Sequence, residues 1–166
     1  MSRIVASLAL LLAFIALAVG WQSVTQVRSP RDAAREFSVR TLDGRTLRLA
    51  ELRGRPVILD FWATWCAPCR ASMPVLSAMQ TRFGSRGLVV VGLSVDDQEP
   101  QVVRRFAERL RIRFPVAMAD ERMLDDYGPI RSIPTTIFID RHGRIVRRVV
   151  GYVDDETLEG FIREIL

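Results

Sequence analysis

The sequence predicts an α/β domain in which parallel strands joined by helices are followed by a strand hairpin and a final helix. Two largely apolar runs, 57–62 and 88–95, are typical of buried strands. The segment 66–83 between them predicts a helix, because Pro68 falls in its first turn and Gly84 ends it. The chain has 166 residues, 49% of them hydrophobic, which fits one such domain with a short N-terminal appendage.

The first element of the domain is a predicted hairpin. Residues 37–40 and 46–49 alternate apolar and polar side chains around Asp43-Gly44, a pair that favours a tight turn. Further along, Pro100 opens a predicted helix whose apolar face is made by Val102, Val103, Phe106 and Leu110.

The rest of the domain follows from turn residues and spacing. Asp96-Asp97 marks the exit of the second buried strand. Then come a short strand at 114–118, a short helix that Gly128 closes, and a hairpin of 134–140 and 145–150 around His142-Gly143. Asp154 or Asp155 caps the last helix, whose apolar residues keep helical spacing at Leu158, Phe161, Ile162, Ile165 and Leu166.

The N-terminal appendage has the composition of a membrane segment. Residues 4–21 carry no charged side chain, and a run of this length can just cross a hydrocarbon core of about 30 Å. We expect residues 1–21 to form an uncleaved signal anchor, residues 22–36 a linker, and residues 37–166 the domain. The alternative is a cleaved signal peptide, since Ala16-Leu17-Ala18 resembles a small-x-small cleavage site.

The expected location follows from this segment and from the cysteines. One arginine precedes the apolar run and three follow soon after, which is against export, but a long folded domain is translocated largely regardless of charge. An isolated cysteine pair also suits a compartment in which disulfides form. We therefore expect a single pass through the cytoplasmic (inner) membrane with the domain on the periplasmic side, or a soluble periplasmic protein if the segment is cleaved.

The charge composition excludes some functions. All 24 basic residues are arginine, so Schiff-base and lysine-nucleophile chemistry are excluded. The net charge is +5, but the arginines are spread along the chain and acidic residues are interleaved with them from Asp32 onward. This distribution is typical of a solvated surface, and we expect no nucleic-acid partner.

The two cysteines, Cys66 and Cys69, carry the chemistry. They stand at the start of the predicted helix, directly after a strand, and the chain has no third cysteine. A helix N-terminus stabilises a thiolate, which predicts Cys66 as the attacking thiol and Cys69, one turn inside, as the resolving thiol. A zinc site would need four ligands, and the chain adds only His142; a structural bridge across two residues would stabilise little. The pattern favours reversible disulfide exchange without a metal or cofactor.

These residues form part of a wider pattern. The run Trp-Ala-Thr-Trp-Cys-Ala-Pro-Cys-Arg at 62–70, Pro74 in the helix and Ile133-Pro134-Thr135 resemble the thioredoxin superfamily. The similarity is closest to its membrane-tethered, exported branch, the TlpA/ResA-like thiol-disulfide oxidoreductases. The resemblance implies a thioredoxin-like fold over about residues 37–166: a central mixed sheet flanked by helices, with an N-terminal β-hairpin and an inserted helix and strand.

The sequence departs from the family pattern at two places. A relative that reduces apocytochromes carries an acidic residue between its cysteines, where this chain has Ala67. Ser132 stands where a glycine is frequent before the Ile-Pro pair. These departures concern the substrate and leave the fold prediction unchanged.

The resemblance also assigns roles to residues around the cysteines. It implies that Asp60, a carboxyl group inside an apolar strand, lies beneath the Cys66–Cys69 redox disulfide and exchanges a proton with Cys69. The alternative is an aspartate that faces solvent at a strand end. A cis peptide bond before Pro134 would let the backbone of Ile133 pair with an extended substrate segment. Besides Ile133, the expected substrate-binding residues are Trp65, Ala67, Pro68 and Thr135, while Trp62 is expected to pack in the core.

The expected function is that of an extracytoplasmic thiol-disulfide oxidoreductase that reduces disulfides in exported proteins. Apocytochrome c or another metalloprotein is a candidate substrate, and a transmembrane thiol-reducing partner would supply electrons. A copper-delivery or assembly factor is the alternative, but it would need a His or Met ligand near the thiols, and His142 is the only histidine. A thiol peroxidase would need Thr/Ser-x-x-Cys, and Thr64 is too close to Cys66 for that spacing.

Overall fold

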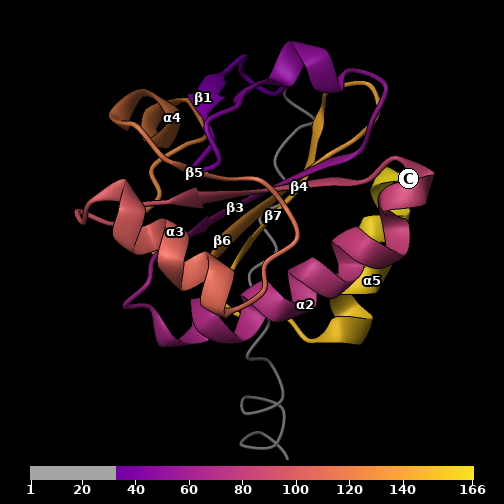
Figure 1. Ribbon diagram of the computed structural model, residues 1–166. Coiled ribbons are helices and arrows are strands. Elements are labelled where there is room, and N and C mark those ends of the chain that lie inside the picture. The colour runs from indigo at the N-terminus through magenta and orange to yellow at the C-terminus, as the bar shows by residue number, and fades with distance from the viewer. Residues whose placement is uncertain (1–32) are drawn as a thin grey trace, which may run out of the picture.

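The computed structural model describes residues 33–166 (Figure 1). Its centre is a five-stranded sheet with the order β5-β4-β3-β6-β7, and β3 (Val57–Trp62) is the middle strand. All six residues of β3 are buried, as its apolar composition predicts. The expected anchor at 1–21 and most of the expected linker lie outside the described residues. No helix within 33–166 combines the length and the hydropathy of a membrane span.

The sheet is mixed. β4 (Val89–Ser94) pairs parallel with β3, and β5 (Val116–Met118) pairs parallel with β4. On the other side, β6 (Thr135–Ile139) pairs antiparallel with β3, and β7 (Ile145–Val150) pairs antiparallel with β6. The predicted mixed sheet is thus confirmed. The carboxyl ends of β3, β4 and β5 share one edge, and the chain enters the cysteine region from that edge.

Helices cover one face of the sheet. This face carries α2 (Ala67–Phe83), α3 (Pro100–Arg109) and α5 (Asp155–Ile165), as Figure 1 shows. Their apolar sides enclose one core with Ile58, Trp62 and both cysteines. Asp154 is the residue that caps α5, since its side chain accepts the N–H of Thr157.

The opposite face is covered by shorter elements. They are the hairpin of β1 (Ser38–Arg40) and β2 (Thr46–Arg48), the 3₁₀ helix η1 (Leu49–Leu52) and α4 (Glu121–Asp126). Their apolar side chains form a second core with Leu59 and Phe61 of β3. A second 3₁₀ turn, η2 (Gly84–Arg86), follows α2. The predicted leading hairpin and the inserted helix and strand before β6 are therefore present.

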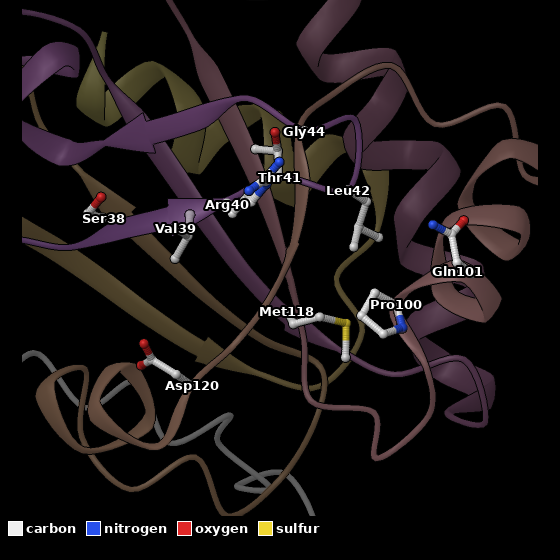
Figure 2. Close-up of a pocket in the computed structure, with 10 residues that line it drawn as sticks. All are labelled: Ser38, Val39, Arg40, Thr41, Leu42, Gly44, Pro100, Gln101, Met118 and Asp120. Carbon is white, nitrogen blue, oxygen red and sulfur yellow. The ribbon is translucent and has the colours of Figure 1, made fainter.

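The hairpin also covers the edge of the sheet. Thr41 forms an isolated antiparallel bridge with Ala117 of β5, and the Leu42 N–H donates to the Val116 carbonyl at 2.7 Å. Beside this junction a groove opens between β1, β5 and the first turn of α3, and Figure 2 shows its lining side chains. They include Arg40, Gln101, Met118 and Asp120, and none is a residue that the sequence predicts for the active site.

Candidate active site

The two cysteines form a disulfide at the start of α2. Cys66 is the N-cap residue, with its Cα atom 5.3 Å from that of Cys69. The backbone N–H of Cys69 donates to Cys66 Sγ at 3.2 Å. Cys66 is 5% exposed and Cys69 is fully buried, so Cys66 is the sulfur that a second molecule can reach. The helix N-terminus and this N–H group are the groups that would stabilise a thiolate at Cys66.

A short turn connects β3 to the disulfide. The N–H of Cys66 donates to the carbonyl of Ala63 at 3.2 Å, which leaves Thr64 and Trp65 at the central positions. Trp65 is 66% exposed beside the disulfide, whereas Trp62 is fully buried, as expected for a rim residue and a core residue. Ala67 and Pro68, between the cysteines, are also exposed.

The peptide bond between Ile133 and Pro134 is cis, as the resemblance implies. Thr135 pairs with Phe61, so Pro134 and Ile133 continue next to the chain that leaves β3 for Cys66. The carbonyl of Pro134 accepts the N–H of Gly151 at 2.8 Å. Within residues 33–166, the N–H and carbonyl of Ile133 make no backbone hydrogen bond, and its side chain is half-buried. These groups are available to an added strand.

Thr135 differs from its expected role. Its side chain is buried, and its hydroxyl donates to the carbonyl of Ser132 at 2.6 Å. The hydroxyl therefore fixes the loop before β6 and does not reach the surface. The pattern Ile-Pro-Thr marks the loop correctly, but strand alternation turns the Thr135 side chain inward.

Asp60 is fully buried in the middle of β3. The hydroxyl of Thr136, its partner on β6, donates to Asp60 Oδ1 at 2.9 Å, while Oδ2 has no hydrogen-bond partner among the described residues. Burial raises the pKa of Asp60 to about 7, against a smaller lowering by the Thr136 hydroxyl. A solvent-facing strand-end aspartate, the alternative that the sequence left open, is excluded.

The side chain of Asp60 lies on the same face of the sheet as the disulfide. Ile58 and Trp62 belong to the core that contains Cys66 and Cys69, and side chains two residues apart on a strand share a face. Asp60, which stands between them, therefore points toward α2. A buried acid with a pKa near neutrality, on the same face of the sheet as the two sulfur atoms, can take up and return a proton at physiological pH.

Comparison with known proteins agrees with this geometry. Residues 30–148 match the AhpC/TSA family. The chain belongs to this family. It is 32% identical over 159 residues to the thiol-disulfide oxidoreductase ResA of Halalkalibacterium halodurans, which covers 92% of this chain and 89% of the relative. It is also 32% identical over 133 residues to ResA of Bacillus anthracis, covering 80% and 76%.

Solved structures of other proteins share the architecture. A thiol:disulfide interchange protein of the thioredoxin family from Chlorobium tepidum is 30% identical, with a TM-score of 0.75 over 82% of this chain and 97% of that chain. A DsbF homologue from Corynebacterium diphtheriae, 24% identical with a TM-score of 0.77 over 87% and 95%, shows the same fold. This AhpC/TSA family member is therefore a thiol-disulfide oxidoreductase with a thioredoxin-like fold.

The structure adds residues that the sequence analysis did not single out. Val150 is 58% exposed and Tyr152 is 51% exposed, and both lie where β7 ends beside the cis-proline loop, since Val150 pairs with Thr135. With Trp65 they are the large exposed hydrophobic side chains of the described region. Asp96, which the sequence marks only as the exit of a strand, is the second addition to the site, because its carboxylate binds Thr64 in the turn before Cys66.

The arrangement offers no evident metal site in the part of the chain that is described. Residues 33–166 contain no group of three or more His, Cys, Asp and Glu side chains that could hold an ion. His142 lies in the turn between β6 and β7, next to the strand end at Ile139, which pairs with Val57. The disulfide follows Trp62 at the other end of β3, so His142 and the thiols lie at opposite ends of the sheet.

Proposed function

We propose that this chain is an extracytoplasmic disulfide reductase. In it, Cys66 attacks the substrate disulfide, Cys69 resolves the mixed disulfide, and Asp60 accepts the proton of the Cys69 thiol. The observation that carries the proposal is the order of burial at one helix N-terminus. Cys66 keeps 5% of its surface exposed, Cys69 is fully buried, and the Asp60 carboxyl group is buried on the same face of the sheet. Substrate can therefore reach only the first thiol, while the second can react only within the protein.

The reaction begins from the reduced protein. The Cys66 thiolate attacks one sulfur of a substrate disulfide, which forms a mixed disulfide and releases the other substrate sulfur as a thiolate that takes up a proton. Asp60 accepts the proton of the Cys69 thiol, and Cys69 then attacks Cys66 Sγ. The Cys66–Cys69 bond forms and the second substrate sulfur leaves as a thiolate, which is protonated. Two electrons have moved to the substrate, and a dithiol donor must return two electrons to the protein.

The surface around Cys66 suits an extended polypeptide. The free backbone groups of Ile133 would pair with the substrate segment that flanks its cysteine. Trp65, Val150 and Tyr152 would contact apolar side chains of that segment. Disulfides in unfolded or partly folded proteins are therefore the substrate class, with apocytochrome c or another exported metalloprotein as the candidate.

The location and the electron donor are part of the same proposal. The apolar residues 4–21 would hold the domain on the periplasmic side of the cytoplasmic membrane, close to a transmembrane thiol-reducing protein. A periplasm-dependent reporter fused after Leu166 is expected to be active. Activity of a cytoplasm-dependent reporter at that position, with the first reporter silent, would contradict the topology.

Substrate trapping tests the division of labour between the thiols. Cys69→Ser is expected to accumulate mixed disulfides in the cell envelope, because the thiol that resolves them is missing. Cys66→Ser, the matched control, is expected to trap nothing and to lose disulfide exchange. Iodoacetamide should label Cys66 before Cys69 in the reduced wild-type protein at neutral pH. Faster labelling of Cys69, or equal trapping by both variants, would show that the assignment is wrong.

The copper-delivery alternative lacks a supporting observation in the described region, since His142 lies at the far end of the sheet from the thiols. A thiol peroxidase is also not favoured. Thr64 does not have the Thr/Ser-x-x-Cys spacing to Cys66, and its hydroxyl donates to Asp96.

A further inference from the structure

A buried carboxylate outside the thiol chemistry holds the turn that carries Cys66. The backbone N–H of Thr64 donates to Asp96 Oδ2 at 2.9 Å, and the Thr64 hydroxyl donates to Asp96 Oδ1 at 2.5 Å. Asp96 follows β4 and is only 7% exposed. The Ser94 hydroxyl donates to Asp96 Oδ2 at 2.7 Å, and the Asp96 N–H donates to Ser94 Oγ at 3.1 Å. Both oxygens of the carboxylate are thus engaged in a fixed orientation.

These bonds join two loops at the carboxyl edge of the sheet. The N–H of Val95 donates to the carbonyl of Trp62 at 2.8 Å, which extends the pairing of β3 and β4 up to the turn. Thr64 then contributes two bonds to Asp96, and it is separated from Cys66 only by Trp65. The exposed Trp65 therefore stands between an anchored residue and the helix N-cap.

We infer that Asp96 is a positioning residue, which holds the 63–66 turn so that Cys66 stays at the N-terminus of α2. This inference rests on the proposed role of Cys66 as the attacking thiol. Only in the N-cap position does Cys66 Sγ accept the N–H of Cys69 and face the positive end of the helix dipole. Without the bonds to Asp96, Thr64 has no side-chain hydrogen-bond partner among the described residues, and we expect thiolate stabilisation at Cys66 to weaken.

A positioning role and a direct electrostatic role of Asp96 predict opposite shifts in the pH midpoint of Cys66 reactivity when Asp96 is replaced. If the Asp96 charge acted on the thiol through space, removing it would favour the thiolate and lower the pH midpoint of Cys66 reactivity. If Asp96 acts by holding the turn, removing it raises that midpoint. The other charged residues on the segments that meet at the turn are the same in all variants: Asp60, Arg70, Asp97 and Glu99.

Four variants separate the two effects. Asp96→Ala removes both the bonds and the charge. Asp96→Asn removes the charge but keeps an oxygen acceptor for the Thr64 N–H, and its amide can donate to a rotated Thr64 hydroxyl. Thr64→Val removes one bond without changing the charge. Thr64→Ser keeps both donors and is the matched control.

The readout is the rate at which iodoacetamide alkylates Cys66 in the reduced protein, measured against pH with circular dichroism as a check of folding. We expect Asp96→Ala to raise the pH midpoint and to slow alkylation at neutral pH about tenfold. Thr64→Val should shift the midpoint in the same direction by less, and Asp96→Asn and Thr64→Ser should stay close to wild type. If Asp96→Ala does not fold, the comparison of Thr64→Val with Thr64→Ser decides.

Two outcomes would overturn the inference. One is a lowered or unchanged midpoint in folded Asp96→Ala, and the other is equal behaviour of Thr64→Val and Thr64→Ser. If Cys69 instead reacts first in the wild-type protein, the proposed function itself fails, so the two failures are distinguishable.

Discussion

Asp60 shows how a side chain that is proposed to transfer a proton can also carry a cost in stability. Its carboxyl group is fully buried with one hydrogen bond, from Thr136, and burial raises its pKa to about 7. The folded protein therefore binds a proton at pH values at which the unfolded chain has released it. Below about pH 4 this group does not reduce the free energy of unfolding. As the pH rises from about 4 to 7, the free energy of unfolding decreases, and above about pH 7 it decreases no further on account of this group.

We predict that Asp60→Asn is more stable than the wild type at pH 8, by as much as about 4 kcal/mol in the free energy of unfolding. The asparagine oxygen can still accept the Thr136 hydroxyl, and no charge is buried. Near pH 4 the two proteins should differ little. Urea unfolding at several pH values measures this difference.

Asp154→Asn provides a control of opposite sign. Hydrogen bonds from Thr157 lower the pKa of Asp154, so that carboxylate favours folding above the unfolded pKa and the benefit is lost on acidification. A stability difference for Asp60→Asn that does not grow between pH 4 and 7 would contradict the buried-acid interpretation. The same variant is expected to resolve mixed disulfides more slowly, since Cys69 would lose its proposed proton acceptor.

Among single residues, the sequence predicts those site residues whose type is unusual for the neighbouring sequence. Two cysteines at a helix start and an acid in an apolar strand stand out against their neighbours. Asp96 does not, because an aspartate after a strand is a common turn residue and its partner Thr64 lies 32 positions away. Val150 and Tyr152 were missed for a similar reason: only the sheet register places them beside the cis-proline loop.

At the end of the sheet opposite to the disulfide, the side chain of Arg141 connects three segments by hydrogen bonds. This residue lies in the turn between β6 and β7, and its guanidinium donates to three backbone carbonyls: those of Leu166 at 2.6 Å, Gly54 at 3.1 Å and Arg86 at 2.8 Å. These carbonyls belong to the end of α5, the loop before β3 and η2. One side chain thus ties three segments together without touching the active site.

We predict that Arg141→Met lowers the free energy of unfolding by about 1–2 kcal/mol, because three carbonyls lose a donor. Disulfide exchange should be unchanged, since the turn lies at the end of β3 opposite to Cys66. Arg105→Met is the control: Arg105 is exposed on α3, and its side chain makes no hydrogen bond or ion pair within the described residues. Equal losses in both variants would show that the carbonyl contacts do not contribute.

The elements themselves were predicted well, and the differences have local causes. The strand expected at 114–118 begins at Val116, and that expected at 134–140 begins at Thr135. In each case a proline, which lacks a backbone N–H, stands just before the observed strand. The bridge between Thr41 and Ala117 could not be predicted, because it joins segments whose only shared feature is their position at one sheet edge.

For the whole molecule, the central question is the direction of electron flow. Strong oxidants with this fold stabilise the reduced thiolate and reach about −120 mV, whereas thioredoxin lies near −270 mV. Ala67 and Pro68 offer no imidazole and no cation to Cys66. The nearby cation, Arg70, is exposed, and its guanidinium lies 5.8 Å from the centre of the Phe106 ring. Cys69, fully buried on the same face of the sheet as Asp60, has the least support as a thiolate.

We therefore predict a reducing protein, with a potential below about −200 mV at pH 7. Asp60 should contribute to this value, because its carboxylate form disfavours a thiolate on the same face of the sheet. Its pKa of about 7 makes that contribution dependent on pH. Asp60→Asn should then have a higher potential than the wild type at pH 8 and nearly the same potential at pH 5.5. Equilibration with glutathione buffers at both pH values measures these potentials. A wild-type value near −120 mV would make the protein an oxidant and reverse the proposed role, whereas a potential difference independent of pH would remove Asp60 from the explanation.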